Sequence, residues 1–248
     1  MEDKELTIVE HLNELRRRVI YILIAVAITS GAAYHFIDEI LLFITTAGKI
    51  ESLHFINPTE AFFVIIKLSV LVGAIAAMPF ILYQVWRYVG IALKKAERKY
   101  LIYFGPVSFL LFMIGAGFAF RTVLPMAMRF LLSFSKDNIE PMITINNYVS
   151  FLIKMVTAFG LMFELPLVIL FLSKIGVVTP EALKKGRRYA IVIIFVVAAV
   201  LTPPDVISQI MLAVPILLLY EISILICKSV TKKREEQQNL GEPVVNEV

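Results

Sequence analysis

Apolar residues are concentrated in long runs that are separated by short polar segments carrying most of the charge. Six runs approach the length of a membrane span: Val19–Ile37, Ala61–Trp86, Tyr103–Val123, Val149–Leu172, Tyr189–Leu201 and Ser208–Cys227. A helix needs about 20 apolar residues to cross the hydrocarbon core of a bilayer. The pattern therefore predicts an all-α polytopic membrane protein with six transmembrane helices.

The fifth and sixth runs are less suited to crossing a bilayer than the other four. Tyr189–Leu201 has only thirteen residues, and Ser208–Cys227 contains Pro215 and Glu221. A span shorter than the hydrocarbon thickness is accommodated by local thinning of the bilayer or by neighbouring helices. We therefore expect helices five and six to be short. The alternative is that these two runs form a re-entrant hairpin.

Composition supports a membrane protein and argues against several kinds of function. Hydrophobic residues make up 59% of the chain, compared with about 45–50% in globular proteins. The single cysteine, Cys227, cannot form an internal disulfide. The sequence has no P-loop, no GxSxG elbow, no HExxH pair and no long basic-aromatic stretch suited to nucleic acid. We expect no enzymatic activity, no nucleic-acid partner, no cofactor and no metal site.

The distribution of basic residues predicts the orientation of the chain. With six spans, one side of the membrane carries eighteen lysines and arginines, and the other side carries four. Basic residues in short connections favour the cytoplasmic side, so both termini are expected in the cytoplasm. Residues 1–237 are expected to form a single membrane domain. The charged segment 238–248 is expected to be a disordered tail.

The stretch EHLNELRRR, residues 10–18, places Glu14 among arginines at the edge of the first apolar run. One interpretation is an ion pair within the helix, because Glu14 and Arg18 are four residues apart and share a face. The other interpretation is that Glu14 receives an arginine from another molecule. The sequence of this stretch does not decide between them.

A second acid lies in the basic stretch LKKAERK, where Glu97 has four basic neighbours. Its structural interpretation is a surface pair with Lys94, worth about 0–1 kcal/mol. Glu14 and Glu97 are, however, both predicted on the cytoplasmic side. Together they could bind a pair of guanidinium groups, since guanidinium and carboxylate form strong bidentate contacts.

A third acid, Glu164 in FGLMFELPLV, lies inside the fourth apolar run. An acid within a span costs about 2.5–3.5 kcal/mol on insertion scales, so it usually faces a polar cavity or a partner. Pro166 follows two residues later and removes the amide that would bond the carbonyl of Met162. We expect a bend and a polar notch here, or alternatively a neutral Glu164 bonded within the bundle.

Two further motifs mark helix boundaries. In LTPPD, Pro203 and Pro204 predict a stiff external turn, and Asp205 is expected to cap the sixth helix. In FINPTEAFF, Pro58 and Glu60 are typical of a helix start and are expected to begin the second span.

Seven segments, in this order, resemble the TatC family, the multispan core of the twin-arginine protein translocase. They are HLNELRRR at 11–18, NPTEAFF at 57–63, PFILYQVW at 79–86, AERK at 96–99, FGLMFELP at 159–166, LTPPD at 201–205 and PILLLYEI at 215–222. They run through essentially all six predicted spans.

The resemblance implies a fold and a binding site. The fold is a concave, glove-like bundle of six helices with both ends in the cytoplasm. In this family the acids matching Glu14 and Glu97 hold the paired arginines of a signal peptide on folded cargo. The acid matching Glu164 lies in the groove, where Arg17 and Tyr88 are also expected to contact the signal peptide or a partner helix.

The resemblance also implies partners and a location. Small single-span subunits of the TatA and TatB type, further copies of the chain in a multi-copy complex, and membrane lipid would surround it in the bacterial inner membrane. Transport would use the proton motive force. Two other classes remain open from the residues alone: a proton-coupled secondary carrier that titrates Glu164, and a membrane scaffold without a ligand.

Overall fold

The structure is a computed structural model that describes residues 8–48, 54–92, 101–133, 142–202 and 206–239. The chain divides into two compact units, which are described separately below. Unit 1 comprises residues 1–44 and 55–109, and unit 2 comprises residues 45–54 and 110–248. The described residues are almost entirely helical, which confirms the all-α prediction.

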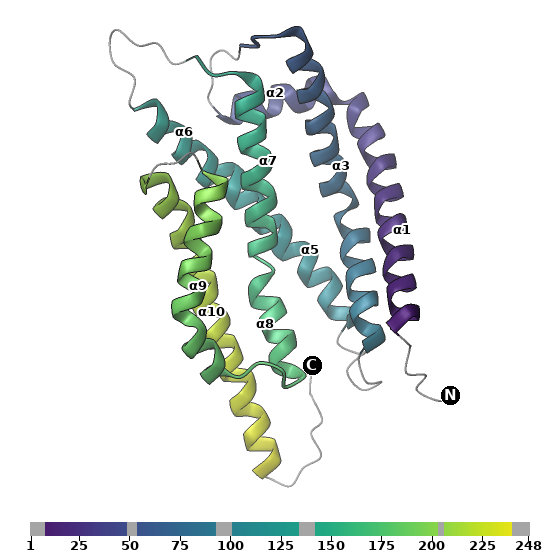
Figure 1. Cartoon of the computed structure of the whole chain (residues 1–248), viewed down its shortest axis with the longest axis vertical. Coiled ribbons are helices and arrows are strands. Elements are labelled where there is room, and N and C mark those ends of the chain that lie inside the picture. The colour runs from purple at the N-terminus through teal and green to yellow at the C-terminus, as the bar shows by residue number, and fades with distance from the viewer. Residues whose placement is uncertain (1–7, 49–53, 93–100, 134–141, 203–205, 240–248) are drawn as a thin grey trace. The chain divides into compact units, whose positions relative to one another are not determined.

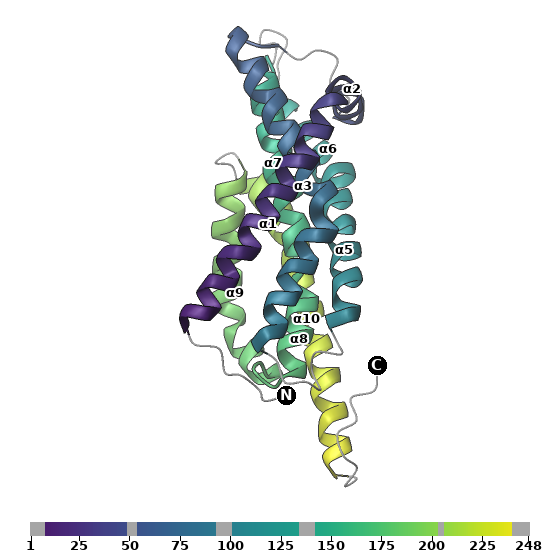
Figure 2. The same ribbon diagram turned by 90° about the vertical axis from the view of Figure 1, so that its right-hand side faces the viewer.

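Unit 1 is built on two long helices that lie side by side, α1 (Ile8–His35) and α3 (Pro58–Val89) (Figures 1 and 2). The helix α3 ends in a short 3-10 turn, η1 (Gly90–Ala92). Pro58 occupies the first turn of α3, where its missing N–H costs nothing. The Glu60 carboxylate accepts a hydrogen bond of 3.0 Å from the N–H of Ile56. The helix start predicted at Pro58 is therefore confirmed.

Small residues bring α1 and α3 into close contact. A Cβ atom added at Gly73 of α3 would lie 2.5 Å from both Cα and N of Ser30 on α1, so only glycine fits there. The Thr29 hydroxyl donates a hydrogen bond of 2.8 Å to the Gly73 carbonyl. Close approach of this kind gives the van der Waals contact on which helix association in lipid depends.

The first half of α5 (Leu101–Phe118) completes unit 1. Trp86 of α3 donates its indole N–H to the Ser108 hydroxyl of α5 at 2.8 Å and stacks on Phe104, with ring centroids 5.1 Å apart. These contacts hold α5 against the end of α3.

The main part of unit 2 starts in the second half of α5, which continues through a π-helical turn, η2 (Ala119–Val123), into α6 (Leu124–Leu132). The N–H of Leu124 bonds the carbonyl of Ala119, five residues back. Pro125, which follows directly, has no N–H to bond a preceding carbonyl. The helix thus runs nine residues past the predicted end at Val123.

The rest of unit 2 consists of α7 (Ile145–Met162), α8 (Leu165–Lys174), α9 (Pro180–Leu201) and α10 (Val206–Asn239). The helix α10 packs against α8 and α9. The core contains Tyr148, Phe159, Leu212, Ile216 and Cys227, which are almost fully buried. The backbone of His54 pairs with Ile143 and Ile145 just before α7, with N···O distances of 3.1 and 2.9 Å.

A short helix, α2 (Ile37–Gly48), lies in the segment that the apolar pattern predicted as an external loop. Its apolar residues form too short a run to indicate a span. Their helical spacing, with two acids in the first turn, was the signal for a helix.

The break between α7 and α8 agrees with the prediction made from Pro166. The helix α7 ends at Met162, Phe163 and Glu164 form a turn, and Pro166 lies in the first turn of α8. Proline cannot supply the amide that would continue α7, so the fourth apolar run forms two consecutive helices.

Among the residues that the structure describes, five segments are long and apolar enough to cross a membrane. They are Val9–His35, Pro58–Val89, Tyr103–Leu132, Ile145–Lys174 and Val206–Lys232. The helix α9 is not among them, because much of its length is the charged start around Lys184 and Arg188. The count of six spans therefore stays a prediction.

The prediction of a short sixth helix is wrong. The helix α10 has 34 residues, and its apolar part extends over Val206–Lys232. Pro215 lies inside the helix without ending it. The polar sequence after Cys227 is rich in Lys, Glu and Gln, which favour helix, so the backbone continues well beyond the apolar run. For α9, likewise, the helix of 22 residues exceeds the thirteen-residue apolar run.

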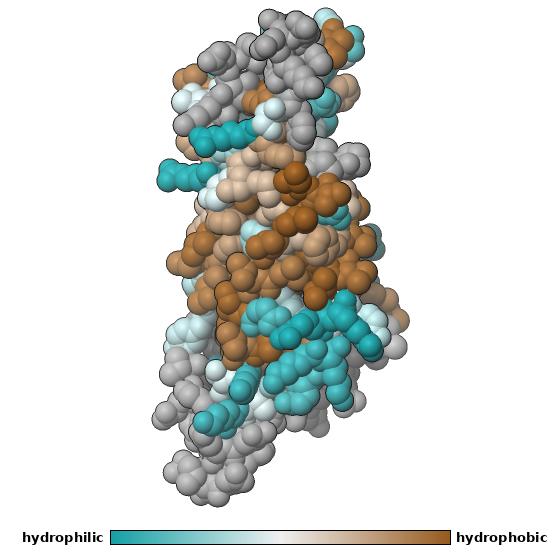
Figure 3. All heavy atoms as spheres, turned by 90° about the vertical axis from the view of Figure 1, so that its left-hand side faces the viewer, coloured by the Kyte–Doolittle hydropathy of each residue, from teal (hydrophilic) through white to brown (hydrophobic). Residues whose placement is uncertain are grey.

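The surface is that of a membrane protein. Figure 3 shows a broad band of hydrophobic side chains on one face, with hydrophilic side chains gathered below it. On α9 alone, Val192, Ile193, Val196 and Val200 are each more than half exposed. Such a band would be unfavourable in water and is expected where lipid covers the protein. The chain is thus a multi-pass membrane protein.

We predict that Gly73→Ala destabilises unit 1 by about 1–3 kcal/mol, because the new methyl group overlaps backbone atoms of Ser30. Thermal unfolding of the detergent-solubilised protein measures the effect. Gly31→Ala is the control, since a Cβ at Gly31 meets no atom within 4 Å. A Gly73→Ala protein that unfolds at the parent temperature would contradict the close α1–α3 packing.

Candidate functional site

The structure describes four of the eight candidate site and external-loop residues named from the sequence. Glu14, Arg17 and Tyr88 belong to unit 1, and Glu164 belongs to unit 2. The other four lie outside the described residues: Glu97, Pro203, Pro204 and Asp205. The proposed pairing of Glu14 with Glu97 and the proposed cap at Asp205 therefore remain predictions.

The carboxylate of Glu14 is fixed by an ion pair with a buried arginine. Nη2 of Arg18 lies 2.5 Å from Oε1 of Glu14, so the ion pair within the helix does form. Nη1 of the same guanidinium donates to Gln84 of α3, at 3.0 Å to the side-chain oxygen and 3.3 Å to the backbone carbonyl. Arg18 thereby ties α1 to α3 and fixes the position of the Glu14 carboxylate.

The other side of Glu14 is open. Its side chain keeps 31% of its surface exposed, whereas that of Arg18 keeps 8%. The second oxygen, Oε2, has no hydrogen-bond partner among the residues that the structure describes. The two interpretations of Glu14 are therefore compatible, because one oxygen serves the helix and the other can accept a further donor.

Glu14 lines a hollow of about 390 Å³ at the end of unit 1. The residues around it are Glu10, Asn13, Glu14, Arg17 and Ile91. Two of these five side chains are carboxylates and one is an amide. The only cation among them, Arg17, donates from Nε to the Tyr21 hydroxyl at 2.8 Å, and its guanidinium carbon lies 5.5 Å from the centre of the Tyr21 ring.

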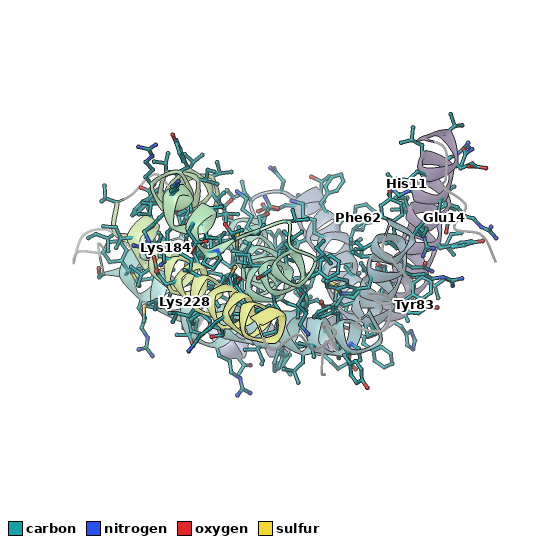
Figure 4. The ribbon with its side chains drawn as sticks, turned by 90° about the horizontal axis from the view of Figure 1, so that it is seen from below. His11, Glu14, Phe62, Tyr83, Lys184 and Lys228 are labelled. Atoms are coloured by element: carbon teal, nitrogen blue, oxygen red, sulfur yellow. The ribbon has the colours of Figure 1, made fainter. Side chains whose placement is uncertain are left out.

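Tyr88 of α3 lies near Glu14 because its ring contacts that of His11 on α1. The rings of His11 and Tyr88 have centroids 4.7 Å apart and are tilted by 33°. Figure 4 shows His11 and Glu14 close together on α1, as expected for residues three apart on one helix face. Glu14, Arg17 and Tyr88 thus lie around one end of the α1–α3 pair.

Glu164 is located at the turn between α7 and α8. It precedes the first residue of α8, and its carbonyl accepts from the N–H of Val168 at 2.9 Å. The residue is half-buried, and its Oε1 atom is shielded from solvent. The helix break at Pro166 therefore places an acid at a partly accessible position inside a predicted span, as the sequence indicated.

Sequence reasoning missed Gln84, Glu10 and Asn13. Gln84 was the most detectable, because it is a lone amide within the apolar stretch PFILYQVW and such a group requires a partner in lipid. Its partner, Arg18, is 66 residues away. Glu10 and Asn13 lie on the first turns of α1, where polar residues are common and carry no special signal.

No group of three or more His, Cys, Asp or Glu side chains suited to a metal ion occurs among the residues whose placement is described. Three of the described side chains that line the hollow, Glu10, Asn13 and Glu14, carry oxygens that can accept hydrogen bonds from a cation. An organic cation with several N–H donors matches the hollow better than a metal ion does, since the described lining has two carboxylates and an amide rather than a set of metal-ligand oxygens.

We predict that Arg18→Gln lowers the free energy of unfolding by about 1–3 kcal/mol, because Gln84 and Glu14 both lose their donor. Arg17→Gln is the matched control. It changes the neighbouring arginine, whose side chain is exposed, and should shift stability by no more than about 0.5 kcal/mol. Equal melting temperatures for the two variants would contradict the structural role of Arg18.

Comparison with known proteins places this arrangement in a family. The model of the family described as Sec-independent protein translocase protein (TatC) matches residues 10–215. The chain is 47% identical over 237 residues to the Sec-independent protein translocase protein TatC of Carboxydothermus hydrogenoformans, covering 94% of this chain and 97% of the relative. It is 45% identical over 236 residues to the TatC protein of Aquifex aeolicus, covering 92% of this chain and 98% of that relative.

A solved structure agrees with these relatives. A crystal structure of the twin-arginine translocase receptor TatC superimposes with a TM-score of 0.81 and 44% sequence identity, covering 90% of this chain and all of the solved chain. TatC is a family of translocase components, and the expectation that the chain is not an enzyme agrees with it. The chain belongs to the TatC family of Sec-independent protein translocase proteins.

Proposed function

We propose that this chain binds twin-arginine signal peptides of folded cargo proteins at its cytoplasmic face and organises the translocation complex around them. The observation that carries the proposal is the Glu14 carboxylate: one of its oxygens is fixed by Arg18, and its partly exposed side chain lines the hollow. A rigid, partly exposed carboxylate is a suitable acceptor for a guanidinium group.

The arrangement suits arginine better than lysine. A guanidinium is planar and has five N–H donors in a fixed fork, whereas an ammonium is a compact point charge that is strongly hydrated. Glu14, Glu10 and Asn13 offer acceptors on adjacent turns of α1. Because Arg18 holds Glu14 in place, little side-chain entropy is lost when a guest guanidinium binds.

Two arginines require a second acceptor, and we assign this role to Glu97. The assignment depends on the sequence, where Glu97 stands alone among basic residues on the predicted cytoplasmic side. Neighbouring cations keep such a carboxylate ionised. The aromatic pair of His11 and Tyr88 forms an apolar wall near Glu14 against which an arginine stem can pack.

We further propose that both termini are cytoplasmic and that the protein lies in a bacterial inner membrane. Support comes from the eighteen basic residues on the side of the termini against four on the other. Small single-span subunits of the TatA and TatB type and additional copies of this chain are the proposed partners. Glu164, shielded and placed at a helix break, is the proposed contact for the apolar part of the signal peptide or for a partner helix.

The proposal predicts that Glu14→Gln weakens binding of a twin-arginine peptide at least tenfold. Glutamine keeps an oxygen for Arg18 but has no negative charge, and truncating one side of a buried charge pair costs about 2–5 kcal/mol. Glu97→Gln should have a similar effect. A fluorescent signal peptide titrated against the detergent-solubilised protein gives the dissociation constants.

The control is Glu39→Gln, an exposed acid of unit 1 on the first turn of α2, outside the hollow. It should bind the peptide as tightly as the parent protein does. A peptide with two lysines in place of the arginines should bind the parent more weakly. The clamp is refuted if Glu14→Gln retains parental affinity while unfolding at the parental temperature, or if the parent does not distinguish arginine from lysine.

A further inference from the structure

A second concave site lies in unit 1, between α3 and α5. It has a volume of about 660 Å³ and is mainly apolar, and its lining comprises Pro79, Tyr83, Trp86, Arg87, Gly105, Pro106 and Phe109. This size falls within the range of about 300–1,000 Å³ that is typical of small-molecule sites. We call it the α3–α5 slot. The proposed recognition of signal peptides does not use it.

The slot is built into the two helices. On α3, Pro79, Tyr83 and Arg87 follow one another at four-residue spacing and therefore lie on one face. On α5, a Cβ at Gly105 would meet no atom within 4 Å, so this glycine leaves open space where a larger side chain would fill it. Both helices carry a proline at the slot, Pro79 and Pro106, and neither proline ends its helix.

The inner wall of the slot is rigid. Trp86 keeps only 7% of its surface exposed. Its indole is fixed by the hydrogen bond to Ser108 and by stacking on Phe104. A site with a fixed wall is preformed and does not need to be ordered when a ligand binds.

One end of the slot is cationic. The guanidinium of Arg87 lies 5.9 Å from the centre of the Tyr83 ring and donates to its hydroxyl at 3.3 Å. Among the described residues no carboxylate pairs with Arg87, and its side chain is exposed. Figure 4 places Tyr83 on the side of α3 away from His11. The positive charge of Arg87 is therefore not neutralised within the described part of unit 1.

We propose that the α3–α5 slot binds an anionic phospholipid, with an acyl chain along the apolar wall and the phosphate at Arg87. Both helices have the length and composition of membrane spans, so lipid is the expected surrounding of their exposed apolar faces. Basic pockets between transmembrane helices recognise anionic headgroups. The exposed Tyr83 is of the residue type typical of the level where headgroups meet acyl chains.

The chain offers a direct reporter, because Trp86 is its only tryptophan. The full protein is reconstituted in mixed bilayers of phosphatidylglycerol and phosphatidylcholine, with bromine on the acyl chains of one lipid at a time. Bromine quenches tryptophan on contact, so the quenching of Trp86 measures which lipid occupies the slot. We expect brominated phosphatidylglycerol to give a relative binding constant about fivefold above that of brominated phosphatidylcholine, from one arginine near the surface.

Two variants distinguish the contribution of the lipid headgroup from that of the acyl chain. Arg87→Gln should bring the relative binding constant to about one, because only the charge is removed from an exposed side chain. Gly105→Leu should reduce the quenching by either lipid, because leucine occupies the slot. Gly117→Leu is the matched control: it alters another glycine of α5 whose Cβ meets no atom within 4 Å and which does not line the slot.

Three results would overturn the proposal. The first is equal quenching of the parent protein by the two brominated lipids. The second is unchanged lipid selectivity in Arg87→Gln, which is informative even if Gly105→Leu fails to fold. The third is recovery of Trp86 fluorescence when an apolar signal peptide is added to the parent but not to Gly105→Leu, which would assign the slot to a peptide.

Discussion

Every polar backbone group in a membrane span must find its partner inside the protein, because hydrocarbon provides none. This constraint makes the described residues almost entirely helical. It also gives each proline a structural consequence, because proline has no N–H to donate. Pro166 lies beside the turn between α7 and α8, and Pro125 lies beside the π-helical turn before α6. The turn at Pro166 carries Glu164, and the α3–α5 slot has a proline on each wall. Two of the positions considered for function, Glu164 and the α3–α5 slot, thus lie where proline removes a backbone N–H.

A buried arginine has the same need, and Arg18 meets most of it: its two terminal nitrogens donate to oxygens from two helices, whereas Nε has no hydrogen-bond partner among the described residues. Gln84 provides two acceptors and Glu14 provides one. Burial of an unpaired guanidinium would be strongly unfavourable, so these contacts fix the register of α1 against α3. The same contacts bear on the function proposed for Glu14. A carboxylate held at one oxygen keeps its direction while the other oxygen can accept a further donor. The structural ion pair and the proposed binding site therefore depend on one geometry.

Much of the fold could be predicted from the sequence, since hydropathy and proline are local signals. The helix start at Pro58 and the break at Pro166 both agree with the structure. The bond between Arg18 and Gln84 could not be predicted, because the apolar stretch shows that Gln84 needs a partner but does not identify Arg18, 66 residues away. The length of α10 was underestimated because hydropathy marks only the part of a helix that lies in lipid. The same limitation hid α2, whose apolar run is too short for a span.

The helix α3 separates two sites of opposite charge in unit 1. Gln84 and Tyr88, four residues apart, contact Arg18 and His11 on α1, whereas the neighbouring positions Tyr83 and Arg87 face the α3–α5 slot. Within about one turn of α3, one face therefore contacts α1, which carries Glu14, and the other face carries the cation Arg87 next to α5. A cationic peptide is repelled by Arg87 and attracted by Glu14, and an anionic headgroup experiences the reverse. Under the two proposals, this arrangement would keep lipid phosphate from competing as a counter-ion for the arginines of a signal peptide, although both ligands would bind at the same end of α3.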